Sequence, residues 1–249
     1  MDTIASCTKA TYLVDEAIVL HLMRYNDTHH IAEVYTRHYG RVSLLVKATR
    51  SKRATLHSTL FRPLTQLRLT WPARGKGLVR PKAAELLMAY TDLTFDAKKM
   101  AIALFLSEHL LHVLRREQPN TPLFDFVCHA FAWLDAAHKG IANFHLVFLI
   151  RLTRFLGFLP YTDDYQQGAC FDLLAGHFTT HSPAHGQFIT AAEAYYMPLL
   201  MRMSFTNMAH FRFNRQQREQ CLSYLLRYYQ LHIPTLPQTK SLDVLCELW

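Results

Sequence analysis

The sequence predicts an α+β protein, with an N-terminal five-stranded OB-type β-barrel followed by a mainly α-helical C-terminal domain. Two observations support this fold class. Short runs of alternating apolar and polar residues, separated by tight turns, fill the first third of the chain, whereas from residue 96 the apolar residues recur at three-and-four spacing. We therefore expect a barrel over 1–93 and a helical domain over 94–249, with an irregular insert at about 159–190.

Five strands account for the expected barrel. Strand character begins at Tyr12, and β-branched and apolar residues dominate the first run. Polar turns at 25–28 and 38–41 join the first three strands, and a long basic loop at 48–58 precedes the last two. The expected strands are 17–24, 30–37, 42–47, 64–71 and 78–90. An SH3-like barrel is the alternative architecture for the same pattern.

Helical periodicity governs the second domain. Asp96 stands at the N-terminus of the first amphipathic helix, and Pro119 and Pro122 mark a stop and a restart. Gly157 is placed to cap a later helix, because glycine readily adopts the left-handed conformation. The expected helices are 96–116, 123–137, 143–156, 191–203 and 214–232, with a short helical turn at 241–249.

Positive charge is concentrated in the stretch 35–84. The chain has a formal net charge of +8, and residues 1–93 hold 14 Lys and Arg against 7 Asp and Glu. The stretch itself contains twelve Lys and Arg and no acidic residue. Cations without a counter-charge repel one another and contribute little to folding, whereas a polyanion would bind them strongly. We expect a nucleic-acid-binding face on the barrel rather than a merely solvated surface.

Composition argues against several other classes of protein. Half of the residues are hydrophobic, enough for packed cores, so wholesale disorder is not expected. The five cysteines are scattered and form no Cys-x-x-Cys pair, which argues against a disulfide framework and a standard zinc knuckle. The N-terminus lacks the pattern of a signal peptide, and no apolar run approaches the ~18 residues of a membrane helix. These features predict a cytoplasmic protein.

Several short motifs together resemble those of the RecO family, the recombination mediators of the RecF pathway. In the expected barrel they are Ala17-Ile-Val-Leu, Arg37-His-Tyr-Gly-Arg-Val-Ser43, Val46-Lys-Ala-Thr-Arg-Ser-Lys-Arg53 and Leu60-Phe-Arg-Pro-Leu64. In the helical domain they are Arg154-Phe-Leu-Gly-Phe158, Tyr224-Leu-Leu-Arg-Tyr-Tyr-Gln-Leu-His232 and Lys240-Ser-Leu242. Each motif is short, but their order and spacing match the family over nearly the whole chain.

The resemblance implies a mediator of DNA repair and homologous recombination. Such a protein binds single- and double-stranded DNA, anneals complementary strands and helps to load recombinase onto DNA coated with single-stranded-DNA-binding protein (SSB). The implied partners are RecR and the C-terminal peptide of SSB, and the implied location is the nucleoid. Many family members carry a four-cysteine zinc module in the second domain. Here that region holds only Cys170, with His177, His181 and His185, so we expect neither zinc nor another cofactor.

Cations and aromatic rings of the basic stretch are the candidate DNA contacts. Lys and Arg release counterions from phosphates, and aromatic rings stack on bases. The expected DNA-binding residues are Arg37, Lys47, Arg50, Lys52, Arg53, Arg74, Lys76, Arg80 and Lys82. The candidates for stacking are Tyr35, Tyr39, Phe61 and Trp71, about half of which we expect in the barrel core.

A second basic group lies in the helical domain. It consists of Arg202, Arg212, Arg215, Arg218 and Arg227, opposed locally only by Glu219. This group is either the solvated face of a helix or the rim of an apolar groove that docks an acidic peptide with an apolar end. The expected contacts of the SSB peptide are Arg151, Arg154, Arg202 and Arg215.

Signatures of catalysis are absent from the sequence. It contains no Gly-x-x-x-x-Gly-Lys-Ser/Thr, no His-Glu-x-x-His and no Gly-x-Ser-x-Gly, so we do not expect an enzyme. Two alternatives stay open. One is an RNA-binding OB-fold module of translation or RNA decay, and the other is a metal-dependent enzyme that uses the histidine-rich loop.

Overall fold

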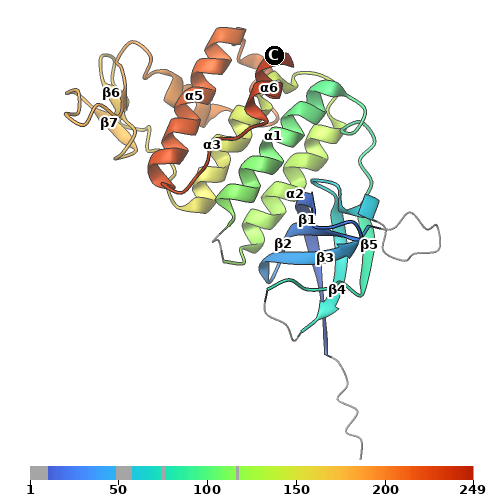
Figure 1. Ribbon diagram of the computed structural model, residues 1–249. Helices are drawn as coiled ribbons and strands as arrows, with labels where there is room; N and C mark the ends of the chain where they lie inside the picture. Colours follow the sequence, from blue (N-terminus) through green and yellow to red (C-terminus); the bar gives the residue numbers. More distant parts are fainter. Residues whose placement is uncertain (1–10, 49–57, 74–76, 116–117, 249) are drawn as a thin grey trace, which may run out of the picture. The chain divides into compact units, whose positions relative to one another are not determined.

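A computed structural model describes residues 11–48, 58–73, 77–115 and 118–248 (Figure 1). The chain divides into two compact units. One unit contains the chain up to Ala89 together with Leu114–Phe124, and the other contains Tyr90–Val113 and the chain from Asp125 onward. The chain therefore enters the second unit, returns to the first for one short segment, and then completes the second.

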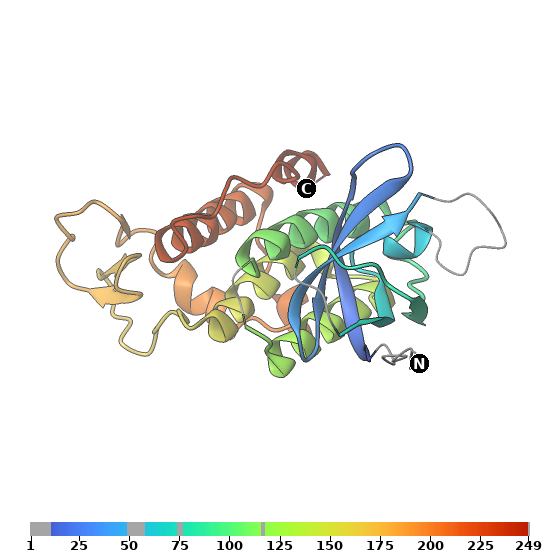
Figure 2. The same cartoon turned by 60° about the horizontal axis from the view of Figure 1, so that its bottom comes forward.

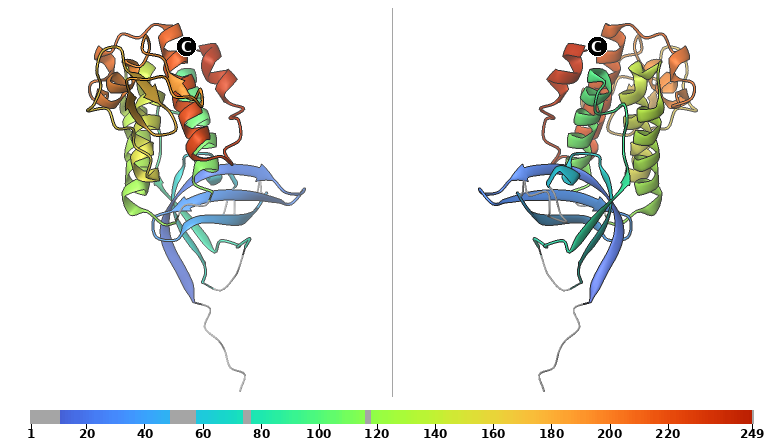
Figure 3. Two further views of the ribbon diagram at one scale, coloured as in Figure 1. Left: turned by 90° about the vertical axis from the view of Figure 1, so that its left-hand side faces the viewer. Right: turned by 90° about the vertical axis from the view of Figure 1, so that its right-hand side faces the viewer.

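Five antiparallel strands form the sheet of the first unit, in the order β3-β2-β1-β4-β5. They are β1 (Tyr12–Arg24), β2 (His29–Thr36), β3 (Gly40–Lys47), β4 (Gln66–Pro72) and β5 (Ala83–Met88). The first half of β1 pairs with β4 and its second half pairs with β2, so β1 connects the β2–β3 part of the sheet with the β4–β5 part (Figure 3). The fold class predicted from the sequence is thereby confirmed.

A parallel bridge between Leu44 and Val79 brings the segment that precedes β5 against β3. Its hydrogen bonds run from Leu45 N to Val79 O and from Val79 N to Ser43 O, at 2.8 and 2.9 Å. Among the described residues this contact is a single bridge and not a full ladder, so the barrel is only partly closed. The bridge nevertheless holds Val79 beside β3.

The core of the first unit consists of the inward-facing residues of the strands. Alternate residues of β2, β3 and β4 are buried, as period-two patterning requires. The short 3-10 helix η1 (Ser58–Phe61) adds Phe61, which is fully buried in the same cluster. Phe61 therefore anchors η1 to the core.

Helices dominate the second unit. They are α1 (Ala97–Val113), α2 (Thr121–Ala136, whose first turn belongs to the first unit), α3 (Phe144–Leu156), α4 (Tyr196–Arg202), α5 (Arg215–His232) and α6 (Leu242–Leu248). Helices α1, α3 and α5 pack side by side, and α6 lies against α1 (Figure 2). Asp96 Oδ1 accepts from the backbone N–H groups of Lys98 and Lys99, which confirms the predicted start of α1. Gly157 caps α3 in the left-handed conformation, with φ 84°.

Helix α4 is shorter than the predicted 191–203 helix. Residues 190–195 form hydrogen-bonded turns, and the helix begins only at Tyr196. Pro198 explains the late start, because proline is tolerated in the first turn of a helix but breaks a helix interior.

The irregular insert contains a small antiparallel sheet, β6 (Cys170–Asp172) between β7 (His177–Thr179) and β8 (Phe188–Ile189). Phe171 and Phe178 face each other across β6 and β7, with ring centroids 5.0 Å apart. Within the described part of the chain, no helix is long and apolar enough to cross a membrane.

Candidate nucleic-acid interface

The outward faces of β2 and β3 correspond to the surface on which OB folds bind oligonucleotides. Residues directly opposite each other in antiparallel strands place their side chains on the same face. Because Ala32 and Leu44 belong to the core, the alternate pairs point outward. These outward pairs are His29–Lys47, Ile31–Leu45, Glu33–Ser43 and Tyr35–Arg41. The surface is therefore mixed, with an acidic residue near its centre.

Two cations of the basic stretch have acidic partners. Arg41 Nε donates to Glu33 Oε2 at 2.8 Å, and Ser43 Oγ donates to the same carboxylate at 2.9 Å. Arg37 Nε donates to Glu16 Oε2 at 2.9 Å. Both acids lie outside 35–84 in the sequence, so strand pairing supplies counter-charges that the stretch itself lacks. The expectation of twelve uncompensated cations is wrong for these two.

The Tyr35 end of the outward face is covered by the segment Leu114–Phe124. Tyr35 is fully buried, its hydroxyl donates to Gln118 O at 3.2 Å, and its ring stacks on Phe124 at 6.5 Å. The guanidinium of Arg37 also lies over the Phe124 ring. Tyr35 is therefore inaccessible to a base, and Arg37 holds this segment in place.

Of the four aromatic candidates, only Tyr39 is substantially exposed, at 46%. Phe61 and Trp71 belong to the barrel core, and Tyr35 lies beneath the covering segment. The expectation that half of the four are core residues underestimated their burial. Two further tyrosines of the first unit are exposed, Tyr12 at 39% and Tyr25 at 60%. The sequence carries no signal that would have identified Tyr12, because its cation, Lys82, is brought to it only by the fold.

Five cations of the stretch are exposed: Lys47, Arg62, Arg68, Arg80 and Lys82. None of them forms an ion pair with another described residue. Lys47 ends β3 opposite His29, and Arg80 follows the bridge that joins Val79 to β3. Lys82 lies over the ring of Tyr12, 4.2 Å from its centroid. Positive charge therefore remains accessible at the Lys47 end of β3 and beside the bridge between Leu44 and Val79.

The remaining predicted DNA contacts lie outside the described residues. They are Arg50, Lys52, Arg53, Arg74 and Lys76. The sequence nevertheless ties them to described positions, because 49–57 follows Lys47 and Ala48 directly and 74–76 precedes Gly77. Both segments are therefore continuous in the chain with described residues of the first unit.

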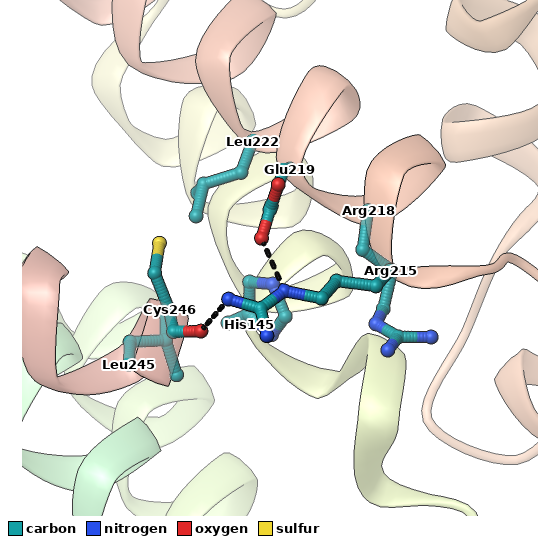
Figure 4. A pocket seen from close by; sticks show the side chains of 7 residues that line it. All are labelled: His145, Arg215, Arg218, Glu219, Leu222, Leu245 and Cys246. Atoms are coloured by element: carbon teal, nitrogen blue, oxygen red, sulfur yellow. Dashed lines mark hydrogen bonds and ion pairs between the residues drawn. The ribbon is translucent and has the colours of Figure 1, made fainter. Parts of the chain in front are cut away.

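The arginines predicted to hold the SSB peptide divide into two pairs. Arg151 donates to Met201 O and Met203 O at the end of α4, and Arg215 donates to Cys246 O in α6 (Figure 4). Arg215 also pairs with Glu219 at 2.7 Å. Arg154 and Arg202, by contrast, are exposed and form no ion pair within the described part of the chain. The structure does not bring the four together around one described pocket.

The hollow beside Arg215 is too small for a peptide. It is lined by His145, Arg215, Arg218, Glu219, Leu222, Leu245 and Cys246 and has a volume of about 20 Å³ (Figure 4). That volume accommodates about one water molecule. A larger hollow of about 440 Å³ lies between the end of α5 and the segment that leads into α6, with Leu226, Leu236 and Leu242 among its lining residues.

A zinc module does not fit the residues of the irregular insert. Cys170 Sγ lies near Ser182 Oγ at 3.9 Å, and His185 Nε2 lies 3.2 Å from Asp172 Oδ2. His177 and His181 each interact with a neighbouring residue through Nδ1. In the described chain, no three His, Cys, Asp or Glu side chains gather as a metal would require.

An OB-type barrel with exposed cations on and beside β3, joined to a mainly helical unit, is an architecture typical of nucleic-acid-binding proteins. Comparison with known families makes this specific. Residues 11–90 match the model of the recombination protein O N-terminal domain, and residues 94–242 match that of its C-terminal domain. The chain belongs to the RecO family of DNA repair and recombination proteins.

Curated relatives agree with this assignment. The chain is 46% identical to the DNA repair protein RecO of Bacteroides fragilis over 234 residues, covering 93% of this chain and 97% of the relative. It is 43% identical to RecO of Phocaeicola vulgatus, with the same two coverages. With RecO of Porphyromonas gingivalis the identity is 37%, over 95% of this chain and 99% of the relative. The similarity therefore spans both units.

Proposed function

We propose that this chain is a recombination mediator that binds single- and double-stranded DNA through backbone charge. It anneals complementary strands and, together with RecR, helps to load recombinase onto SSB-coated DNA in the cytoplasm, at the nucleoid. It performs no bond chemistry of its own. The observation that carries the proposal is the set of exposed cations without ion pairs in the described barrel, in a member of a DNA repair family.

The proposed DNA contacts are Lys47, Arg80 and Lys82 on the described surface, together with Arg50, Lys52, Arg53, Arg74 and Lys76 in the two basic segments. Arg37 is left out of this set because it is engaged by Glu16 and Phe124. Phosphate contacts through Lys and Arg carry no sequence information, so binding should show little sequence preference.

Salt dependence tests the DNA site. Replacing Lys47, Arg50, Lys52 and Arg53 by Ala should weaken binding and lower the slope of log K against log salt by about 0.7–0.9 for each lost phosphate contact. The matched control replaces Lys98, Lys139, Arg212 and Lys240, four exposed cations of the second unit. An unchanged slope in the first variant, or an equal change in the control, would contradict the assignment. RNA competing better than DNA of equal length would favour the RNA-binding alternative.

For the SSB peptide, we propose that Arg154 and Arg202 supply the accessible positive charge. The double variant Arg154→Ala/Arg202→Ala should reduce binding of an acidic peptide with an apolar C-terminus, and it should slow annealing of SSB-coated strands while leaving naked strands unaffected. Arg212→Ala, which removes another exposed arginine of the same unit, is the control. Equal rates with wild type on SSB-coated strands would contradict this part of the proposal.

A further inference from the structure

We propose that the exposed rings of Tyr39 and Tyr12 are two separate base-stacking positions that make the chain prefer unpaired to paired DNA; this inference rests on the DNA binding proposed above. Both rings lie around the C-terminal end of β4. Tyr12 is opposite Pro72 in the β1–β4 ladder, whereas Tyr39 packs on the adjacent Trp71, whose side chain points to the other face of the sheet, into the core.

Tyr39 is held by a buried partner and still presents its ring to solvent. Its centroid lies 5.5 Å from that of Trp71, with the two rings at 85°. Trp71 is only 4% exposed, so it provides a fixed support, whereas Tyr39 is 46% exposed. An edge-to-face contact occupies at most one face of the tyrosine ring. The other face is available for stacking.

Tyr12 combines an exposed ring with a cation. The ammonium of Lys82 covers one face at 4.2 Å, and Lys82 itself is held to the end of β4 by a hydrogen bond from its backbone N–H to Thr70 O. A base on the opposite face of Tyr12 would place its phosphate within the field of Lys82. This combination of aromatic ring and cation is how single-stranded nucleic acid is generally bound.

Charge favours a nucleotide over a protein as the occupant. Lys82 is exposed beside Tyr12, and the two acids that reach the residues before Tyr39 are engaged, because Asp15 accepts from His38 N and Glu16 accepts from Arg37 Nε. In a duplex the faces of the bases are already covered by their neighbours, so these rings have nothing to stack on. Stacking therefore contributes only to binding of unpaired bases, whereas the cations serve both forms of DNA.

The test compares Tyr39→Leu and Tyr12→Leu with wild type on a single-stranded oligonucleotide and on a blunt-ended duplex of two strands, by fluorescence anisotropy at several salt concentrations. Each variant should bind the single strand about 5- to 100-fold more weakly and retain duplex affinity within about twofold. The salt slope should be unchanged, because no phosphate contact is removed. Tyr39→Phe retains the ring and should bind like wild type. So should Tyr25→Leu, which removes a tyrosine that is 60% exposed in the β1–β2 turn.

Equal losses on both DNAs, a loss in Tyr39→Phe, or unchanged single-strand affinity would overturn the proposal; in the last case a protein partner would better explain the exposed rings. Thermal unfolding of each variant reports on folding. Because Tyr39 covers Trp71, Tyr12→Leu carries the test if Tyr39→Leu does not fold. A folded wild-type chain that binds neither DNA would overturn the DNA-binding proposal itself.

Discussion

The guanidinium of Arg37 lies over the ring of Phe124, 4.8 Å from its centroid. The same guanidinium pairs with Glu16 on β1, and the hydroxyl of Thr121 donates to Arg37 O. Arg37 thus connects the barrel to the segment Leu114–Phe124, which belongs to the same compact unit. A residue that charge alone suggests for DNA binding is used to hold the fold together.

Replacing Arg37 by Ala should therefore affect stability more than DNA binding. Loss of a partly buried ion pair and a cation–π contact should lower the free energy of unfolding by about 1–2 kcal/mol. Denaturant unfolding and salt-dependent DNA titration measure the two effects. The control is Lys47→Ala, which removes an exposed cation of the proposed DNA contacts that has no ion pair in the described structure. We expect the reverse pattern there, with a lower salt slope and little loss of stability. A lower salt slope in Arg37→Ala would contradict the structural role.

Local features of the fold were predictable from the sequence, because they depend on residues near one another in the chain. Alternation and tight turns predicted the barrel, and Asp96 and Gly157 predicted helix ends. The pairing of Arg37 with Glu16 could not be predicted in this way, since it depends on the register between β1 and β2. The burial of Tyr35 beneath Gln118, 83 positions away, is likewise a tertiary effect.

The candidate site was predictable in part for the same reason. Charge composition identifies a basic stretch, but it does not show which cations have partners across a strand. Aromatic residues are ambiguous in sequence, because core packing and base stacking use the same side chains. Only their burial in the structure shows that Trp71 and Phe61 are core residues. Only its contact with Lys82 makes Tyr12 a candidate for base stacking.

Two buried histidines should make the protein sensitive to mild acid. His109 and His145 are almost fully buried, and burial lowers the pKa of each from 6.5 to about 3. Below pH 6.5 the unfolded chain therefore binds protons that the folded chain does not. Stability should fall by up to about 1.4 kcal/mol per pH unit for each histidine as the pH drops towards 3.

Denaturant unfolding between pH 7 and 4 tests this expectation. His109→Phe keeps an aromatic ring between Phe105 and Tyr229 and removes one titrating group, so it should flatten the pH dependence. His181→Phe, in the exposed part of the insert, controls for replacement of a histidine as such. Parallel pH profiles for His109→Phe and wild type would contradict the assignment.

Glu108 anchors the C-terminal helix. Its carboxylate accepts from Lys240 N at 3.0 Å, Ser241 N at 2.9 Å and Ser241 Oγ at 2.5 Å. Burial raises the pKa of Glu108, but these hydrogen bonds outweigh it and hold the pKa below its usual value. Ionised Glu108 therefore stabilises the folded chain at pH values above the ordinary pKa of a glutamate. This stabilisation is lost as the pH falls through the lowered pKa of Glu108 in the folded chain.

Glu108→Ala should release α6 without unfolding the unit. Hydrogen exchange within 242–248 should accelerate, while exchange in α3 stays slow because that helix is buried along most of its length. Ser241→Ala keeps the two backbone hydrogen bonds and should have a smaller effect. If Glu108→Ala leaves exchange in α6 unchanged, the packing of Leu245 alone holds the helix.

The β6–β8 sheet should hold its structure without metal. Asp172 Oδ1 accepts from Leu174 N at 2.8 Å and Ala175 N at 3.1 Å, and its second oxygen faces His185. Burial raises the pKa of Asp172, but the backbone hydrogen bonds and His185 outweigh it, so the pKa lies below its usual value. Asp172 therefore stabilises the turn above the ordinary carboxylate pKa and ceases to do so in acid.

A chelator should leave thermal unfolding unchanged, and the purified protein should contain far less than one zinc per chain. Asp172→Ala should accelerate hydrogen exchange in 170–179, whereas Asp172→Asn retains an acceptor for the turn and should have a smaller effect. Cys170→Ser tests the thiol separately and should alter neither metal content nor exchange, because Cys170 Sγ contacts only a hydroxyl among the described polar groups. Stoichiometric zinc, or a fall in unfolding temperature on chelation, would show that the insert binds metal through ligands beyond those described.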